Sequence, residues 1–348
     1  MKKAVIIGGG FAGSTVAKKL EKHFEVVLID AKDYFEFTPG ILREIVFQSK
    51  GEYVQGLHRN YLRKAGFIKG VATSIDEKNV FLGRKKISYD YLVICSGSGY
   101  AYPIKEQGIV LADRMENLKK SHYQLENSKK IAIIGGGLVG VELAGEICTK
   151  YDKEITIIHG AERLIERNPK KASEYSRKFL EKRGVKILFN EFFREKKGDY
   201  CITDKGTEVK SDLVFLCTGM HSNSDFMQKN FKKSLNEKGQ IEVDEFLNVR
   251  GSRNIFAVGD VNDLLVEKTA QNSILQAEIV ARNIISIEKS GKLKEYKPKR
   301  TSLVISLGRD KGIFVWKNFA VFGFIPALMK KAIQFFYMIK YRRQNKAE

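Results

Sequence analysis

The order of apolar and polar residues is the same in two stretches of the chain. Residues 2–7 and residues 130–134 are short apolar runs, and each is followed by three consecutive glycines, at positions 8–10 and 135–137. In both stretches a segment compatible with a helix comes next, and a second apolar run follows it. Short apolar runs that alternate with helical segments are typical of βαβ units with parallel strands. The pattern therefore predicts an internal duplication.

Each stretch also closes in the same way. An apolar run at residues 91–95 leads into Ser96 and Gly97, and an apolar run at residues 213–217 leads into Thr218 and Gly219. We therefore predict an α/β protein with two Rossmann-like dinucleotide-binding domains and a small C-terminal region. The predicted boundaries are 1–113 and 241–300 for the two parts of the first domain, 114–240 for the second domain, and 301–348 for the C-terminal region.

The glycine-rich turns have the spacing of a dinucleotide-binding loop. The first glycine permits a tight turn from strand to helix, the second lets the backbone approach a pyrophosphate, and the third lets helix and strand pack closely. Amide groups at the start of the helix then face the phosphates. Asp30, at the end of the second apolar run, is placed to accept hydrogen bonds from a ribose. The loop glycines are Gly8, Gly10 and Gly13 in the first copy and Gly135, Gly137 and Gly140 in the second.

The composition is that of a folded protein with an excess of positive charge. The 348 residues are 43% hydrophobic and 29% charged, which excludes a disordered chain and a polytopic membrane protein. The chain carries 61 Lys and Arg against 41 Asp and Glu, and the net charge of +20 indicates acidic partners or surfaces. The four cysteines and five histidines form no CxxC or HExxH pattern, so we expect neither a metal site nor a disulfide scaffold.

We predict no targeting segment and no spanning helix. The apolar run at the N-terminus stops at the glycine triplet, and no small-residue cleavage site follows it. Residue 2 is Lys2, which excludes N-myristoylation at that position. No stretch reaches the ~18 apolar residues of a transmembrane helix. We therefore expect a protein that faces the cytosol.

Further motifs give the chain a family resemblance. Residues 254–260, which read Asn-Ile-Phe-Ala-Val-Gly-Asp, resemble the second flavin motif of two-dinucleotide-binding-domain flavoproteins. Residues 135–146 are similar to the signature of the type II NADH:quinone oxidoreductases. Shorter matches resemble the branch of ferroptosis suppressor protein-like quinone reductases, and they lie at residues 30–35, 155–159, 203–209, 217–219 and 296–298. The resemblance covers nearly the whole chain.

The resemblance implies that the first copy binds FAD and the second binds NAD(P)H. It also implies that Asp260 holds the ribityl chain of FAD and that Glu142 faces the nicotinamide carboxamide. The alternative for Glu142 is a carboxylate that only stabilises the first turn of its helix. The predicted FAD-binding residues are Gly8, Gly10, Phe11, Ala12, Gly13, Asp30, Ala31, Lys32, Ala72, Ser96, Gly97, Gly259 and Asp260. The predicted NAD(P)H-binding residues are Gly135, Gly137, Leu138, Val139, Gly140, Glu142, His159, Thr218 and Gly219.

His159 stands where most dinucleotide-binding domains of this type have an acidic residue. An acid there would bind the ribose 2′-hydroxyl and repel a 2′-phosphate, whereas a histidine does neither strongly. We therefore predict that both NADH and NADPH are accepted, with NADH as the preferred hypothesis.

The resemblance also bears on the electron acceptor. Disulfide reductases of this superfamily carry a cysteine pair after the second strand, and the corresponding residues 34–51 contain none. Sulfide:quinone oxidoreductases need cysteines near the flavin, but we interpret Cys95 and Cys217 as small core residues. Residues 269–276 resemble the quinone-side helix of type II enzymes, with an ordinary helix N-terminus as the alternative. The predicted quinone-side residues are Gln271, Gln276 and Lys340, with Glu142 and Gln271 as the catalytic pair.

The end of the chain is basic and amphipathic. Residues 289–348 hold 15 Lys or Arg against three acids, and residues 302–307 and 313–316 are β-like. A helix is predicted to begin at Pro326. One face carries Leu328, Ala332, Phe335, Phe336 and Ile339, and the opposite face carries Lys330, Lys331, Gln334, Tyr341 and Arg342. We interpret it as an interfacial helix that binds anionic membrane; the alternative is a helix packed on the enzyme or on a second subunit.

Together these features predict an NAD(P)H:quinone oxidoreductase that does not pump protons. Hydride passes from NAD(P)H to FAD, and two electrons then pass to a membrane quinone. We expect a peripheral protein on the cytoplasmic side of a membrane, with no specific nucleic-acid partner and with homodimerisation left open. The alternatives are a soluble reductase of a ferredoxin or rubredoxin, and a non-enzymatic flavoprotein that binds nucleic acid as apoptosis-inducing factor does.

Overall fold

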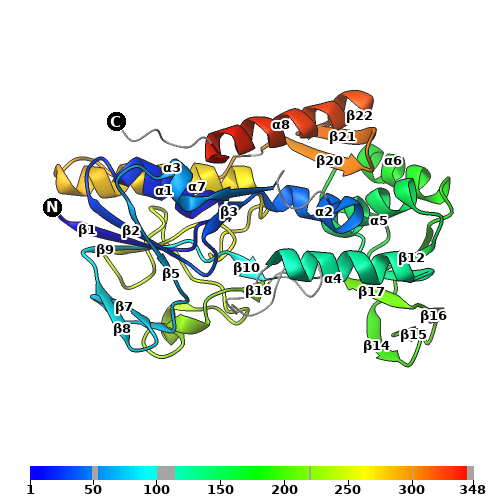
Figure 1. The fold of residues 1–348 in the computed structure, drawn as a ribbon, viewed down its shortest axis with the longest axis horizontal. Coiled ribbons are helices and arrows are strands. Elements are labelled where there is room, and N and C mark those ends of the chain that lie inside the picture. Colours follow the sequence, from blue (N-terminus) through cyan, green and yellow to red (C-terminus); the bar gives the residue numbers. More distant parts are fainter. Residues whose placement is uncertain (49–53, 100–113, 219–220, 300, 343–348) are drawn as a thin grey trace.

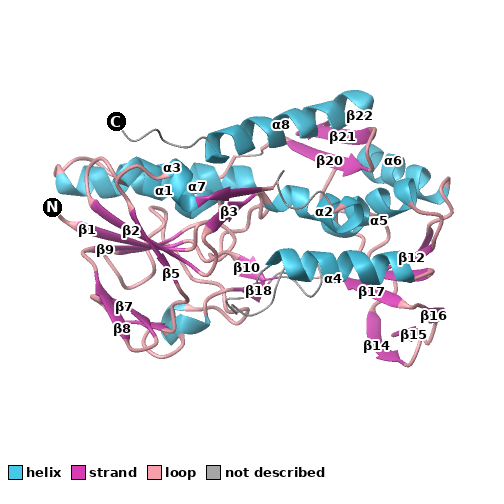
Figure 2. Ribbon diagram, viewed as in Figure 1, coloured by secondary structure: helices cyan, strands magenta, loops and turns pink. Residues whose placement is uncertain are grey.

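The computed structural model describes residues 1–48, 54–99, 114–218, 221–299 and 301–342. Two parallel sheets lie side by side along the molecule, and a three-stranded antiparallel sheet packs beside the second (Figure 1, Figure 2). The parallel sheets correspond to the two copies predicted from the apolar pattern, so the predicted α/β fold class is confirmed.

The first parallel sheet has the strand order β19-β9-β1-β2-β5. Every residue of β9 is buried, as is typical of a central parallel strand covered on both faces. Helices α1 and α7 pack against each other over this sheet. The elements are β1 (Lys3–Ile7), α1 (Phe11–Leu20), β2 (Glu25–Asp30), β5 (Gly66–Lys69), β9 (Tyr91–Ile94), β19 (Ile255–Ala257) and α7 (Ala270–Glu288). Because β19 comes from beyond the second sheet, the chain leaves the first domain and returns to it.

The second parallel sheet repeats this construction with the order β13-β12-β11-β17. A three-stranded antiparallel sheet, β14-β15-β16, is inserted before its last strand. The elements are α4 (Arg114–Asn127), β11 (Lys130–Ile134), α5 (Leu138–Lys150), β12 (Glu154–His159), α6 (Lys170–Glu181), β13 (Lys186–Phe189), β14 (Phe193–Lys197), β15 (Tyr200–Thr203), β16 (Glu208–Lys210) and β17 (Leu213–Leu216).

The two segments in which the chain passes between the parallel sheets are joined by hydrogen bonds. Strand β10 (Ser98–Gly99) pairs with β18 (His221–Ser222) in antiparallel fashion. The hydroxyl of Ser96 donates to the carbonyl of Asn223 (2.6 Å), and the Asn223 amide side chain donates to the carbonyl of Ser96 (2.9 Å). These contacts fix the closing turns of the first copy against the segment that follows the second.

The elements that remain outside the C-terminal region are short. They are β3 (Tyr34–Glu36), α2 (Ile41–Phe47), β4 (Gln55–Leu57), α3 (His58–Tyr61), β6 (Ser74–Ile75), β7 (Asn79–Leu82), β8 (Lys85–Ser88) and the 3₁₀ turns η1 (Thr38–Gly40), η2 (Asp225–Met227) and η3 (Lys232–Ser234). Of these, α2 packs on α4 and α5, so its apolar side chains join the core of the second domain.

The C-terminal region forms an antiparallel sheet and one long helix. Strands β20 (Leu303–Leu307), β21 (Lys311–Trp316) and β22 (Phe319–Gly323) pack on α5 through β20, and the β-like character predicted for the first two is confirmed. Helix α8 (Phe324–Arg342) begins two residues before the predicted Pro326. It runs from this sheet to α3 and β4, and so spans both halves of the molecule (Figure 1).

Helix α8 is anchored by the face that the sequence suggested was polar. Tyr341 is 1% exposed, stacks on Phe35 with ring centroids 3.7 Å apart, and shares a hydrogen bond of 2.9 Å with the hydroxyl of Ser14. Four residues of the predicted apolar face, Leu328, Phe335, Phe336 and Ile339, are exposed. Within the described ranges, no helix combines the length and the hydropathy that crossing a bilayer requires.

Candidate functional site

The first glycine loop joins β1 to α1 and has the geometry of a phosphate cradle. Gly8 has a φ of +98°, and its amide donates to the carbonyl of Ile29 at 2.8 Å. A Cβ on Gly13 would come within 1.7 Å of the Gly8 carbonyl oxygen, so only glycine permits this packing of helix on strand. A Cβ on Gly10, the N-cap of α1, would meet no described atom within 4 Å. The amides at this helix start therefore face a space that fits a pyrophosphate.

Asp30 ends β2 beside this loop, as predicted. Its two carboxylate oxygens accept hydrogen bonds from the amides of Gly9 and Lys32. The fully buried imidazole of His58 lies 3.9 Å from this carboxylate, and burial lowers the pKa of His58 to about 4, so it is neutral. Its Nε2 has no hydrogen-bond partner among the described residues, which fits a polar ligand at the ribose position. His58 was missed because α3 carries no motif.

The second glycine loop, between β11 and α5, has the same geometry. Gly135 has a φ of +105°, and its amide donates to the carbonyl of Ile158 at 2.8 Å. A Cβ on Gly140 would come within 1.9 Å of the Gly135 carbonyl oxygen. Around Gly137, the N-cap of α5, a Cβ would meet nothing described within 4 Å. The chain therefore forms two phosphate cradles with one design.

His159 occupies the position of Asp30 in the second copy. Its Nδ1 accepts a hydrogen bond from the Gly136 amide (3.0 Å), so its Nε2 carries the proton that is donated to the Arg163 carbonyl (3.1 Å). The carboxylate of Glu166 lies 3.5 Å from Nε2 and is half exposed. The imidazole of His159 thus contacts the glycine loop through Gly136, and the carboxylate of Glu166 lies beside its other nitrogen.

The predicted flavin motif brings Asp260 and the start of α7 together. The Asp260 carboxylate accepts a hydrogen bond from Ser98 (3.2 Å). Gln276 is 1% exposed, and its side-chain oxygen accepts from the Gly259 amide and from Asn262, both at 2.8 Å, so it supports the turn. Gln271 is exposed in the first turn of α7. The structure thus gives the two glutamines different surroundings.

Glu142, in the second turn of α5, is held by the C-terminal region. Its carboxylate accepts from the Ser306 amide in β20 (2.8 Å) and pairs with the ammonium group of Lys330 in α8. Both side chains are nearly buried. Lys330 was missed because the sequence indicated only that it lies opposite the apolar face. Glu146, one turn later, pairs with Arg43 of α2 at 2.8 Å, in line with a structural role.

The other predicted residues lie in the two cores, at strand ends or in a groove. Phe11, Ala12 and Ala72 are buried in the core of the first domain, and Leu138 and Val139 are half-buried in the second. Ala31, Lys32, Ser96, Gly97 and Thr218 lie at strand ends around the two cradles, Gly219 lies outside the described residues, and Lys340 lines a groove between α1, α7 and α8.

Burial holds three of the four cysteines as protonated thiols. All four are free thiols, and burial raises the pKa of Cys95 and Cys217 well above the usual range and that of Cys148 to about 11. A protonated, buried thiol is a poor nucleophile. Across the described ranges, no group of three or more His, Cys, Asp and Glu side chains is arranged to hold a metal ion.

The chain is similar to known proteins over most of its length. Residues 2–278 match the model of the pyridine nucleotide-disulphide oxidoreductase family. The chain is 32% identical to human ferroptosis suppressor protein 1, over 94% of this chain and 91% of that protein. It is 30% identical to apoptosis-inducing factor homolog A of Dictyostelium discoideum, over 94% of this chain and 88% of that protein.

Solved structures share the fold. The sulfide:quinone oxidoreductase of Aquifex aeolicus has a TM-score of 0.82 at 20% identity, and the match covers 100% of this chain and 93% of that one. NDH2 of Plasmodium falciparum, solved in complex with NADH, has a TM-score of 0.81 at 16% identity, with complete coverage of both chains.

The two cradles fit FAD and NAD(P)H, and the matching family confirms the prediction of an oxidoreductase that uses both cofactors. The predicted relation to ferroptosis suppressor protein 1 is likewise confirmed. This chain belongs to the pyridine nucleotide-disulphide oxidoreductase family, among the relatives of ferroptosis suppressor protein 1.

Proposed function

We propose that this protein is a peripheral membrane NAD(P)H:quinone oxidoreductase that does not pump protons. The observation that carries the proposal is the pairing of two dinucleotide cradles with a C-terminal helix whose apolar face is exposed. The likeness to human ferroptosis suppressor protein 1 over most of both chains supports it. Bound FAD would supply the two-electron chemistry that links a nicotinamide to a quinone.

The side chains have positioning roles in this proposal. The loop amides near Gly10 and Gly137 bind the pyrophosphates, and Asp30 and Asp260 bind hydroxyl groups of FAD. Glu142 orients the nicotinamide, and Lys330 and the Ser306 amide hold its carboxylate in place. Gln271 is the proposed quinone contact, since it is exposed in the first turn of α7. Gln276 supports the Gly259 turn from within.

The exposed apolar residues suggest how a lipid-soluble quinone is reached. Most of the large exposed apolar side chains of the described residues belong to the C-terminal region, and they form what we call the apolar stripe: Trp316, Phe319, Phe324, Ile325, Leu328, Ile333, Phe335, Phe336 and Ile339. Contiguous exposed apolar surface marks a partner or a membrane. A helix of this kind lies in the lipid interface with its apolar face inserted. The stripe would therefore hold the enzyme where quinone is dissolved.

A turnover assay tests the reaction. Purified protein is mixed with NADH and a short-tail quinone, or with NADH and a ferredoxin, and the loss of NADH absorbance is followed. We expect rapid NADH consumption only with quinone. Consumption only with the ferredoxin would contradict the proposal.

Vesicle flotation tests the membrane surface with a matched pair of variants. Phe335→Ser/Phe336→Ser removes two exposed rings from the apolar stripe, and Tyr123→Ser/Phe192→Ser removes two exposed rings from the second domain. The first variant should lose most of its flotation and the second should float as the native protein does. Equal flotation of all three proteins, or a dimer that dissociates only in the first variant, would contradict membrane insertion.

A further inference from the structure

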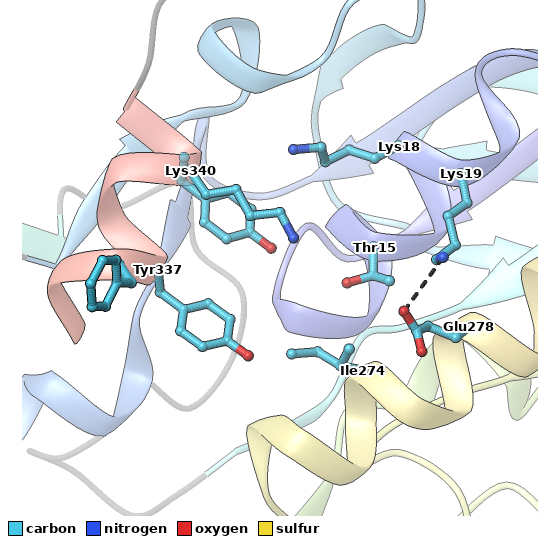
Figure 3. A pocket seen from close by; sticks show the side chains of 9 residues that line it. Thr15, Lys18, Lys19, Ile274, Glu278, Tyr337 and Lys340 are labelled. Atoms are coloured by element: carbon cyan, nitrogen blue, oxygen red, sulfur yellow. Dashed lines mark ion pairs between the residues drawn. The ribbon is translucent and has the colours of Figure 1, made fainter. Parts of the chain in front are cut away.

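A groove of about 380 Å³ lies between helices α1, α7 and α8, beside the apolar stripe. Figure 3 shows Lys18 of α1 and Lys340 of α8 extending into the space between their helices, with Thr15 and Tyr337 on its walls. Neither lysine belongs to the two cradles. Lys340 is among the residues predicted from the sequence for the quinone side, whereas Lys18 belongs to no predicted site.

The positive charge of the groove is unbalanced. Lys19, on the rim, pairs with Glu278 at 3.4 Å. By contrast, among the described residues no carboxylate lies within 4 Å of the ammonium group of Lys18 or Lys340. Lys18 lies over two ring faces, with its Nζ 5.6 Å from the Tyr61 centroid and 5.7 Å from that of Tyr341, and the carboxylate of Glu21 interacts with its charge. Desolvation lowers the pKa of Lys18, and the charge of Lys340 lowers it further. An anion between the two ammonium groups would relieve this repulsion.

The groove is also continuous with apolar surface. Phe336 lies on its wall and is 69% exposed, and it belongs to the apolar stripe. Its ring contacts that of Phe335 edge-on, so both rings lie at this end of the stripe. Thr15 and Tyr337 add hydroxyl groups to the wall. A ligand that matches the lysines, the hydroxyl groups and the apolar wall of the groove has an anionic head with hydrogen-bond acceptors and an apolar body.

We propose that this groove binds the phosphate-bearing headgroup of an anionic phospholipid, clamped between Lys18 and Lys340, while the acyl chains lie along the apolar stripe. The inference rests on the proposed membrane association but not on the identity of the electron acceptor. Because α1 begins at the first cradle and α8 contacts Glu142 through Lys330, a lipid bound here would orient the enzyme on the bilayer through the two helices that hold its site.

The test measures binding to vesicles of phosphatidylcholine alone and of phosphatidylcholine with 20% phosphatidylglycerol. The variant Lys18→Gln/Lys340→Gln removes two charges from the groove. The matched control, Lys85→Gln/Lys86→Gln, removes two exposed charges from the β7–β8 hairpin on the opposite side of the molecule (Figure 1). Each cation at an anionic surface contributes about fivefold to affinity, so the groove variant should bind the phosphatidylglycerol vesicles about 25-fold more weakly. The control should change less than twofold, and the native protein and both variants should bind pure phosphatidylcholine equally.

Several outcomes would overturn the inference. Equal loss in both double variants would mean attraction by net charge alone. Native protein that binds the two vesicle types equally would mean that no anionic headgroup is recognised. Unchanged vesicle binding with a raised KM for a short-tail quinone in the groove variant would assign the lysines to quinone instead. Thermal unfolding and flavin content, measured on each variant, exclude misfolding as the cause of any loss.

These outcomes also separate this inference from the proposed function. If native protein fails to consume NADH with quinone but still shows the 25-fold difference, the lipid site stands and the proposed reaction falls. If it turns over quinone but shows no preference for phosphatidylglycerol, the reaction stands and the lipid site falls.

Discussion

The two glycine loops have the same backbone geometry and very different surroundings. In the first copy, the helix that follows the loop begins with Phe11 and Ala12, which are buried beneath neighbouring elements including α8. In the second copy, the equivalent Leu138 and Val139 are half-buried. The strand-end residue differs as well, with the carboxylate of Asp30 in one copy and the neutral imidazole of His159 in the other. The first residues of α1 are thus packed beneath α8, and the equivalent residues of α5 are more exposed.

The largest expected effect comes from replacing the third glycine of one loop at a time by alanine. Gly13→Ala places a Cβ 1.7 Å from the Gly8 carbonyl oxygen, and Gly140→Ala places one 1.9 Å from that of Gly135. We expect Gly13→Ala to lose its flavin. Gly140→Ala should keep its flavin, which dithionite still reduces, but should lose more than about 100-fold in kcat/KM for NADH, equal to about 2.7 kcal/mol. Absorbance spectra and stopped-flow reduction measure both, and loss of flavin from both variants would contradict the assignment of the two loops.

A pH series tests the burial of His58 beside the first cradle. Burial lowers the pKa of His58 to about 4, below its unfolded value of about 6.5, so folding disfavours the protonated form. Stability from this residue is therefore fully present above pH 6.5 and is lost as the pH falls toward 4. Between pH 7 and pH 4.5 the free energy of unfolding should fall by about 2–3 kcal/mol from this group. Chemical denaturation should show a shallower fall in His58→Gln, and identical slopes would argue against a buried neutral histidine.

Two adjacent lysines sharpen the link between α8 and the second cradle. Lys330 pairs with the nearly buried Glu142, whereas Lys331 pairs with the exposed Asp310 at 3.7 Å. Lys330→Met leaves the Glu142 carboxylate without its counter-charge, and we expect kcat/KM for NADH to fall about tenfold. Lys331→Met removes only a surface ion pair and should change kcat/KM less than about twofold. Steady-state kinetics of the two variants decide this, and equal effects would mean that Glu142 is not positioned by Lys330.

The last expected effect concerns nucleotide choice at the second cradle. His159 leaves the ribose without a strand-end acid, so native kcat/KM values for NADH and NADPH should differ by less than about 100-fold. His159→Glu restores a carboxylate and should shift the ratio toward NADH by about tenfold. A native ratio beyond 100-fold would contradict the predicted tolerance, and it would point to the nearby carboxylate of Glu166 as the discriminating group.

The sequence predicts the backbone of the site better than its side-chain partners. The glycine loops and the position of Asp30 follow local spacing, because strand, turn and helix are contiguous in the chain. His58 and Lys330 were missed because they reach the site from α3 and α8, through contacts between residues distant in sequence. Periodicity could not show that the Tyr341 side of α8 packs inward, since a tyrosine and long cationic side chains also satisfy a buried contact.

The most direct test of the proposed function is the flavin absorbance of the purified protein in an anaerobic stopped-flow experiment. NADH is mixed with the oxidised protein, and a short-tail quinone is added once reduction is complete. We predict that the yellow absorbance bleaches with NADH and recovers fully with quinone, in both steps faster than steady-state turnover. A protein that stays colourless after reconstitution with FAD, or that bleaches with NADH and does not recover with quinone, would contradict the assignment of this chain as an NAD(P)H:quinone oxidoreductase.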